Sequence, residues 1–459
     1  MACLLLRHNE TDVQIPTTEE VESITFYKII VRVGEVSWKV DRRYNEFHIL
    51  HNQLVADHGI SKDILPSKKV IRNKCPPFIE ARRKGLEEYL QKTFIFLKRT
   101  MPRVFVEFLH FHLYDIYFLL QDLSVRCFEK AESILPLDNS YTFTPLELYS
   151  ISEFLSKPFP IIDNIDNKLD LSSVLELCAQ LDKLTIQGSC HEYLQSNIVF
   201  NALSFELSSF KVIKSLCLKN VDVNMIYSLG NLRSTVLELQ VHDTQIISIS
   251  QILQCDVLHK DTIIGSEKWS VLKTLDLSNN KLEVIDGTIS LAKNLTSLNL
   301  SNNKIPNILN LVHLPNLQML NLTNNLITVC EDLHTKLGNI LTLNLSQNGI
   351  VTTKGFRKLY SLETLDLSCN RVTQIEEIKY IAKLPCLENL ILTGNGVSTS
   401  VDYRVTVLEY FGNRAKYICL DNERPTQAEL DKVSVMHALR ILKEGKTPNL
   451  LTEKFSGEH

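Results

Sequence analysis

Leucines recur at a fixed spacing over much of the second half of the chain. The pattern L-x-x-L-x-L-x-x-N-x-L begins at Leu272, and six copies follow one another up to residue 397. The asparagines of successive copies are 23, 22, 23, 22 and 25 residues apart. A copy of this length cannot bury its own leucines, so several copies must stack. Because the spacing is not heptad, a coiled coil is excluded.

This pattern predicts a right-handed leucine-rich repeat solenoid with a parallel β-sheet over residues 271–400. Each copy contributes one short strand with its leucines turned inward. The asparagine of each copy is expected to turn inward as well and to satisfy backbone groups where the chain leaves the strand. These asparagines are Asn280, Asn303, Asn325, Asn348, Asn370 and Asn395.

Short polar residues alternate with the leucines along each predicted strand, as at Thr274, Asp276 and Ser278 in the first copy. We expect these positions to face solvent on the concave side and to bind a protein partner. The alternative is that short polar side chains only keep this face soluble. The candidate contacts are Asp276, Asn299, Asn321, Asn344 and Asp366.

A weaker form of the pattern precedes the regular copies and a different sequence follows them. Residues 169–270 contain leucines at similar spacing without the asparagine, which predicts irregular repeats with an insertion. Residues 401–446 predict a cap that hides the last leucine row, followed by a charged helix. Residues 447–459 are expected to be disordered.

Residues 1–120 show a different pattern, which predicts an α+β domain with a small sheet and helices. β-branched and aromatic residues fill positions 24–33, Gly34-Glu35 suits a turn, and positions 36–40 suit the returning strand. Apolar residues at helical spacing then predict helices from about Phe47 to Gly59, over 78–96 and over 103–120. Residues 121–168 predict a helical connector.

Candidate binding chemistry lies at the junction of the second strand and the first helix. Arg43 and Tyr44 are adjacent there. A guanidinium matches a phosphate group with several donors, and a tyrosine offers a flat face to a ring. Together they suggest a site for a phosphorylated ring with hydroxyl edges, such as an inositol headgroup. The neighbouring Arg42, and Arg83 further on, are expected to support the fold or to face solvent.

A basic loop follows this junction. Residues 61–84 hold eight Lys or Arg against two acidic residues, in a chain whose net charge is −4. An apolar pair inside such a loop, Val70 and Ile71 beside Arg72 and Lys74, suits peripheral contact with an anionic membrane. The alternative is an ordinary solvated charged loop.

The order of motifs in this region resembles the PX (phox homology) family. The motifs are Trp38-x-Val40-x-Arg42-Arg43-Tyr44-x-Glu46-Phe47, then Leu65-Pro66-x-Lys68, then Phe78-Ile79-Glu80-x-Arg82. The resemblance implies that Arg43 binds the 3-phosphate of phosphatidylinositol 3-phosphate and that Tyr44 lies under the inositol ring. It implies further that Lys68 contacts the 1-phosphate and that Arg82 binds the 4- and 5-hydroxyls.

The amino-acid composition and the absence of certain motifs argue against several classes of function. The chain has 459 residues, with 44% hydrophobic and 22% charged, and its negative net charge argues against a nucleic-acid partner. It contains no run of 18 apolar residues. Eleven scattered cysteines with no C-x-x-C pair indicate reduced thiols in the cytosol. No catalytic motif or metal-ligand spacing is present, so we expect neither an enzyme nor a metal or cofactor.

A PX domain before leucine-rich repeats resembles the nischarin family, also called imidazoline receptor antisera-selected proteins. Two further stretches, at 108–112 and 333–340, carry the same resemblance. It implies a cytoplasmic scaffold, peripheral on early or recycling endosomes and also at the plasma membrane. That scaffold restrains Rac and p21-activated kinase signalling, and so cell migration, and contacts Rab GTPases.

Two points stay open at this stage. Integrin cytoplasmic tails are partners of this family, but that binding is tied to a region beyond the repeats in longer members. The alternative function is a leucine-rich repeat regulatory subunit of a phosphatase or kinase, with a PX domain that does not bind lipid.

Overall fold

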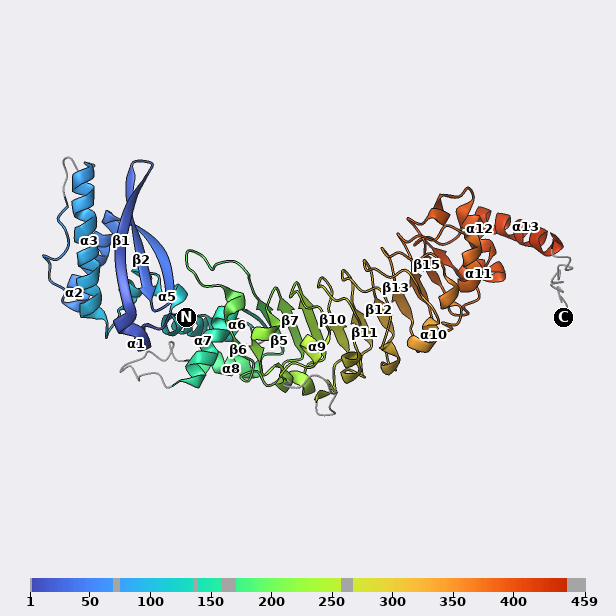
Figure 1. Ribbon diagram of the computed structural model, residues 1–459, viewed down its shortest axis with the longest axis horizontal. Coiled ribbons are helices and arrows are strands. Elements are labelled where there is room, and N and C mark those ends of the chain that lie inside the picture. Colours follow the sequence, from blue (N-terminus) through green and yellow to red (C-terminus); the bar gives the residue numbers. More distant parts are fainter. Residues whose placement is uncertain (1, 69–74, 135–138, 158–170, 257–266, 444–459) are drawn as a thin grey trace, which may run out of the picture. The chain divides into compact units, whose positions relative to one another are not determined.

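The computed structural model describes residues 2–68, 75–134, 139–157, 171–256 and 267–443 (Figure 1). The chain divides into two compact units, one comprising residues 1–213 and 218–229 and the other 214–217 and 230–459. Strand β7 (Ser215–Lys219) falls at this division. The expected disordered tail and the apolar and basic loop residues Val70, Ile71, Arg72 and Lys74 lie outside the described residues.

The first unit begins with an antiparallel sheet in the order β1-β2-β3, and the strands are β1 (Thr11–Val21), β2 (Ile24–Val33) and β3 (Val36–Arg43). Gly34, at φ +56°, makes the turn between β2 and β3, as the sequence predicted. The register of β1 shifts between Gln14 and Thr17, next to Pro16. Proline has no N–H to donate to the ladder, which accounts for the irregularity there.

Helices pack against this sheet around a core of aromatic residues. The first two are α2 (Tyr44–His58), which ends at the left-handed Gly59, and α3 (Pro76–Leu97). Trp38, Phe47, Tyr89, Phe105 and Phe111 are each at most 1% exposed in this core. The smaller elements of this part are α1 (Leu4–Arg7), η1 (His8–Glu10), α4 (Arg103–Phe108), α5 (Phe111–Tyr114) and α6 (Ile116–Ile134).

The prediction of a single helix over residues 103–120 is wrong, because the structure has three helices, α4, α5 and α6, that begin within this range. His110 adopts a left-handed conformation at φ +57°, and Asp115 is extended, so each interrupts the helix. The carboxylate of Asp115 accepts hydrogen bonds from the backbone N–H groups of Leu4 (2.6 Å) and Tyr117 (3.0 Å). The break before α6 therefore places the fully buried carboxyl group of Asp115 where it hydrogen-bonds to the backbone of Leu4, in α1.

The rest of the first unit contains the start of the parallel strands. Strand β4 (Ser140–Phe143) pairs in parallel with β5 (Lys183–Gln187), so the stretch expected as a helical connector also contributes a strand. Leu184 and Ile186 of the irregular repeats lie buried in β5. The remaining elements are α7 (Pro145–Ser156), α8 (Ser172–Gln180), η3 (Phe200–Ala202), β6 (Phe205–Glu206), η4 (Val223–Met225) and β8 (Ile226–Tyr227).

A segment after β5 packs on the PX-like part of the same unit. The backbone N–H of Lys39 on β3 donates to the carbonyl of Gln195 (2.9 Å). The side chain of Asn197 accepts from the N–H of Ser37 (2.9 Å). The Tyr193 ring lies 5.8 Å from that of Tyr114, centroid to centroid. The open edge of β3 is therefore covered by residues 193–203.

The second unit is a stack of short parallel strands, each from one repeat (Figure 1). Leu275, Leu298, Leu320, Leu343 and Leu365 pair with one another in register, and each is at most 1% exposed. The strands are β9 (Glu238–His242), β10 (Thr274–Asp276), β11 (Ser297–Asn299), β12 (Met319–Asn321), β13 (Thr342–Asn344), β14 (Thr364–Asp366), β15 (Asn389–Ile391) and β16 (Cys419–Leu420).

Short helices connect these strands. They are η5 (Leu229–Ser234), α9 (Ser250–Leu253), η7 (Gly287–Leu291), η8 (Leu311–His313), α10 (Leu333–Lys336), η9 (Lys354–Phe356), η10 (Ile375–Glu377), α11 (Ile378–Ile381) and η11 (Gly396–Thr399).

The array ends in helices that follow the last repeat. Val407 and Leu408 of α12 are fully buried, and Arg404 pairs with Glu429 of α13 (Nε to Oε1, 2.7 Å). Arg414 donates to the carbonyls of Leu384 (2.6 Å) and Leu387 (2.8 Å). The cap elements are α12 (Tyr403–Glu409), η12 (Gly412–Tyr417) and α13 (Gln427–Lys443).

Candidate functional site

Arg43 lies where β3 ends and α2 begins. Its backbone is extended, and its N–H donates to the carboxylate of Glu46 (2.8 Å) in a capping box. The side chain is 48% exposed, and its Nε lies 3.5 Å from Oε2 of Glu46. The start of a helix carries a partial positive charge, so this guanidinium stands where an anion is favoured. An anionic ligand would compete with Glu46 for it.

Arg82 of α3 lies between two aromatic rings. Its guanidinium carbon is 4.2 Å from the centroid of Tyr44 and 4.3 Å from that of Phe78. Its Nε and Nη2 atoms are buried and have no hydrogen-bond partner among the described residues. Burial raises the pKa of the nearby Tyr27, while the charge of Arg82 opposes that rise. Unpaired guanidinium donors beside an aromatic ring are suited to an anion or to hydroxyl groups.

A hollow of about 310 Å³ lies between α2 and residues 62–68. Tyr44 and Lys68 both line it, and the Tyr44 hydroxyl donates to the carbonyl of Pro66 (2.5 Å). Burial raises the pKa of Tyr44, so its hydroxyl stays protonated at neutral pH. The other lining residues are His48, His51, Asn52, Val55, Lys62, Leu65, Pro66 and Ser67.

The structure thus brings the four candidate residues together only in part. Tyr44 touches Arg82 through its ring and shares the hollow with Lys68, whereas Arg43 is joined to Tyr44 through the chain. Arg43 and Arg82 are not among the residues that line the hollow. Tyr44 is therefore the residue that connects the three cations: it follows Arg43 in the chain, its ring contacts Arg82, and it lines the hollow together with Lys68.

Sequence reasoning missed the histidines and the asparagine of this hollow. His48 and Asn52 pair through Nδ1 and Nδ2 (3.2 Å), and Nε2 of His51 lies 3.2 Å from the carbonyl of Lys62. The helical spacing of Tyr44, His48, Asn52 and Val55 places them on one face of α2. That spacing is a signal which could have identified them.

Arg42 and Arg83 support the fold, as expected. Arg42 donates to the carbonyl of Phe108 through Nε (3.0 Å) and Nη2 (2.8 Å), and burial lowers its pKa. Arg83 pairs with Glu80 through Nη2 (2.7 Å) and donates to the carbonyl of Ile15 beside the β1 irregularity. The guanidinium groups of Arg42 and Arg83 are therefore held by contacts within the protein, whereas the Arg43 side chain is 48% exposed and can meet a ligand.

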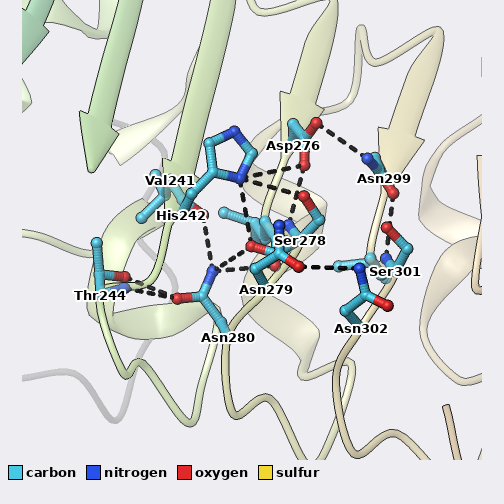
Figure 2. Close-up of polar contacts among 12 residues, drawn as sticks. Val241, His242, Thr244, Asp276, Ser278, Asn279, Asn280, Asn299, Ser301 and Asn302 are labelled. Atoms are coloured by element: carbon cyan, nitrogen blue, oxygen red, sulfur yellow. Dashed lines mark hydrogen bonds and ion pairs between the residues drawn. The ribbon is translucent and has the colours of Figure 1, made fainter. Parts of the chain in front are cut away.

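The asparagines of the repeats form the predicted inward ladder. Nδ2 of Asn325 donates to the carbonyls of Leu300 (2.9 Å) and Leu322 (3.1 Å), and its Oδ1 accepts from the N–H of Ile305 (3.0 Å). Nδ2 of Asn280 likewise donates to the carbonyls of Val241 and Leu277, and its Oδ1 accepts from the N–H of Thr244 (Figure 2). Each asparagine ties its own repeat to a neighbour.

The candidate partner residues of the strands form a second polar row. Nδ2 of Asn299 donates to Oδ2 of Asp276 (2.9 Å), as Figure 2 shows. Asn344 accepts from the Thr323 hydroxyl (2.9 Å), and Asp366 accepts from the N–H of Ser368 (2.9 Å). All five candidates, Asp276, Asn299, Asn321, Asn344 and Asp366, are half-buried.

The expectation that every alternate position of these strands faces solvent is wrong. Ser278, Ser301 and Ser346 are between 5% and 7% exposed. The strands end at the preceding aspartate or asparagine, whose side chain accepts a hydrogen bond from the N–H of the serine. The chain therefore turns inward at the serine, and the accessible face consists of the earlier positions.

His242, Asp276 and Ser278 lie together without forming a catalytic relay. Nδ1 of His242 is 3.1 Å from Oγ of Ser278 and 3.9 Å from Oδ1 of Asp276 (Figure 2). A serine–histidine–aspartate relay needs the serine and the carboxylate on different ring nitrogens. This arrangement is a structural contact.

Metal sites, membrane-spanning helices and disulfides are the remaining features that bear on function. Within the described ranges, no group of three or more His, Cys, Asp or Glu side chains could hold a metal ion. No helix of the described part has the length and apolar character needed to cross a membrane. The eleven cysteines form no disulfide, and all lie in the described part.

Family models match two regions of the chain. Residues 32–112 match the PX domain, residues 270–327 match the leucine-rich repeat, and residues 338–380 match two further copies of it. The chain carries a PX domain followed by leucine-rich repeats. These domain types are typically non-catalytic binding modules.

Curated relatives match the PX region. Sorting nexin-24 of Rattus norvegicus is 36% identical over 104 residues, which is 23% of this chain and 55% of that protein. The Homo sapiens protein is 38% identical over 104 residues, 22% of this chain and 59% of its own length. The kinase Sgk3 of Rattus norvegicus is 38% identical over 84 residues, 17% of each chain. The chain thus spans little more than half the length of the sorting nexins it matches.

Two solved structures are similar in part. An internalin from Listeria monocytogenes has a TM-score of 0.34 and 19% identity, covering 49% of this chain and 65% of that one. A designed CISK-PX domain has a TM-score of 0.20 and 31% identity, covering 21% of this chain and 97% of that one.

Proposed function

We propose that this protein is a membrane-associated adaptor whose PX domain binds phosphatidylinositol 3-phosphate through Arg43, Tyr44, Lys68 and Arg82. The observation that carries this proposal is the Arg82 guanidinium, stacked on the Tyr44 ring with Nε and Nη2 unpartnered among the described residues. Arg43, half-exposed at the start of α2, supplies a second cation for the 3-phosphate. The loop residues Val70, Ile71, Arg72 and Lys74 complete the membrane contact in this proposal.

The similarity of the PX region to sorting nexin-24 supports a peripheral location on endosomes. In this proposal the repeats hold signalling proteins next to that membrane. By resemblance to the nischarin family, the partners are Rac and Rab GTPases and p21-activated kinase, and the outcome is restraint of Rac signalling and cell migration. An integrin cytoplasmic tail is a further partner in that family.

The lipid half of the proposal is tested by sedimentation with vesicles. Phosphatidylcholine vesicles would carry a few mole per cent of phosphatidylinositol 3-phosphate, phosphatidylinositol 4-phosphate or neither. The proposal expects the whole chain to sediment with the first and to stay in solution with the other two. Equal sedimentation with all three would refute it and would favour a PX domain that contacts protein.

The partner half is tested on the strand face with variants that leave the hydrogen-bonded row intact. Met319 is 49% exposed on β12, beside the half-buried Asn321. Met319→Arg is expected to reduce capture of GTP-loaded Rac at least about tenfold, as buried contacts in an interface do. Val312→Arg, on η8 and 61% exposed, is the control and should leave capture unchanged. Equal capture by both variants would count against the strand face.

A further inference from the structure

Two successive repeats of the second unit surround a hollow of about 570 Å³ with cations and tyrosines. Arg357, Lys358 and Tyr360 lie on the segment between η9 and β14. Lys379, Tyr380 and Lys383 lie on the corresponding segment, around α11, that precedes β15. The hollow therefore belongs to the segments that lead into the strands.

The stacking of the repeats accounts for this cluster. Thr364 of β14 pairs in register with Asn389 of β15, so the segments that lead into these strands also lie side by side. Lys358 and Lys383 occupy matching places in that register, 25 residues apart. A cation at such a place in two neighbouring repeats becomes a pair of neighbouring cations in the fold.

No carboxylate offsets these charges within the hollow. Its lining consists of four cations and two tyrosines, and none of the four forms an ion pair with another described residue. Lys379 lies over the Tyr380 ring, with Nζ 4.8 Å from the centroid. Glu377 of η10 accepts hydrogen bonds from Thr352 Oγ1 (2.8 Å) and from the Thr353 N–H (2.7 Å). Four like charges around one hollow repel one another, and a bound anion would relieve that repulsion.

We propose that this hollow binds a phosphorylated side chain in a peptide segment of a protein partner. A phosphate group carries nearly two charges and three acceptor oxygens, so several lysines and an arginine can meet it at once. The volume lies within the range of about 300–1,000 Å³ that is usual for ligand sites. Clusters of basic residues are one of the general modes by which phosphorylated peptides are recognised.

The lining favours a peptide over a membrane surface. Membrane contact needs an apolar side chain that inserts between lipids, and no aliphatic residue lines this hollow. Tyr360, 59% exposed, instead offers a ring against which a peptide side chain can pack. Tyrosine rings and cations around one hollow suit a peptide that carries both charge and apolar surface.

The experiment uses the whole chain and two immobilised peptide libraries. One library holds short random peptides with a central phosphoserine, phosphothreonine or phosphotyrosine, and the other holds the same peptides without phosphate. The test variant is Arg357→Glu with Lys379→Glu. The control is Lys281→Glu with Lys304→Glu, two exposed cations of earlier repeats, which changes the net charge by the same amount. The milder pair Lys358→Gln with Lys383→Gln guards against a folding defect in the test variant.

The proposal expects the wild-type chain to be retained at least about tenfold more by the phosphorylated library. The test variant and the milder pair should lose that preference while melting at the wild-type temperature, and the control should keep it. Arg43→Ala should keep it too, because the hollow does not depend on the headgroup site. Sedimentation with phosphatidylserine vesicles should be the same for the wild type and the test variant.

Three results would overturn the proposal. The first is equal retention by the two libraries. The second is an equal loss of retention in the test variant and the control, which would reflect net charge alone. The third is a loss of phosphatidylserine vesicle binding in the test variant with peptide retention unchanged, which would make the hollow a lipid contact.

Discussion

The guanidinium of Arg82 stacks on the ring of Tyr44, with its central carbon 4.2 Å from the ring centroid. The two residues come from different helices, α3 and α2, and lie 38 positions apart in the chain. The stack fixes a planar cation beside the tyrosine that the resemblance assigns to the inositol ring. It also leaves two guanidinium nitrogens without a hydrogen-bond partner among the described residues.

Replacing Arg82 by glutamine is expected to weaken binding to phosphatidylinositol 3-phosphate vesicles by about 10- to 100-fold. A hydrogen bond to a charged group contributes about 1.5–3 kcal/mol, and each 1.4 kcal/mol is a tenfold change in affinity. The thermal unfolding midpoint should change little, because the lost cation–π contact contributes only about 1 kcal/mol. Arg99→Gln, an exposed cation of the same domain, is the control. Equal affinities for the two variants would remove Arg82 from the site.

Replacing Tyr193 by alanine is expected to loosen β3. The Tyr193 ring packs between Phe200 (4.8 Å, centroid to centroid) and Tyr114 (5.8 Å), and it anchors the segment that bonds to the edge of β3. Loss of the ring should destabilise the first unit by about 2 kcal/mol. Amide hydrogen exchange should become faster at Ser37 and Lys39, whose N–H groups bond to that segment. Unchanged exchange at these two amides would show that the segment does not support the strand.

The sequence predicted the repeats far better than it predicted this packing. The leucine and asparagine spacing reflects contacts between neighbouring repeats, so each copy carries the signal for the next. The contact between Lys39 and Gln195 joins parts of the chain 156 residues apart and leaves no periodic trace. The sequence also failed to predict the left-handed backbone at His110. The apolar pattern around that residue continues at helical spacing, so it gives no sign of the break.

Replacing Asn325 by alanine is expected to destabilise the second unit by about 3 kcal/mol. The asparagine side chain satisfies the N–H of Ile305 and the carbonyls of Leu300 and Leu322, all in a buried setting. Each buried backbone group left unsatisfied costs about 1–3 kcal/mol. Urea unfolding followed by circular dichroism measures the loss. Asn316→Ala, at an exposed position, should unfold like the wild type, and equal stability of the two variants would argue against the ladder.

Asp115 predicts a pH dependence of stability. Burial raises the pKa of its carboxyl group to about 7, well above the ordinary value near 4 in an unfolded chain. The folded state thus keeps a proton that the unfolded state releases. The stabilisation is full below about pH 4 and is lost as the pH rises through about 7, by up to about 1.4 kcal/mol per pH unit.

The measurement compares the wild type with Asp115→Asn in denaturant unfolding of the chain from pH 5 to pH 8. Asparagine is close in shape to the neutral acid and does not titrate. The wild-type free energy of unfolding should fall relative to that of the variant as the pH rises. A constant difference between the two proteins over this range would contradict the assignment.

The sequence proposed the residues of the candidate site, and it predicted their arrangement only in part. Motif order pointed to Arg43, Tyr44, Lys68 and Arg82, and the structure joins Tyr44 to Arg82 and to Lys68. The contribution of His48 and His51 depends on which face of α2 is turned to the hollow. That face is set by the packing of Phe47 and Leu54 into the core, and not by any motif.

The most direct test of the whole account is the affinity of the Arg43→Ala variant for vesicles with and without phosphatidylinositol 3-phosphate. Arg32→Ala, an exposed cation on β2 of the same sheet, is the matched control. The account predicts that Arg43→Ala loses the lipid-dependent binding at least about tenfold while Arg32→Ala keeps it. Lipid-dependent binding that survives Arg43→Ala at the level of the control would contradict the account.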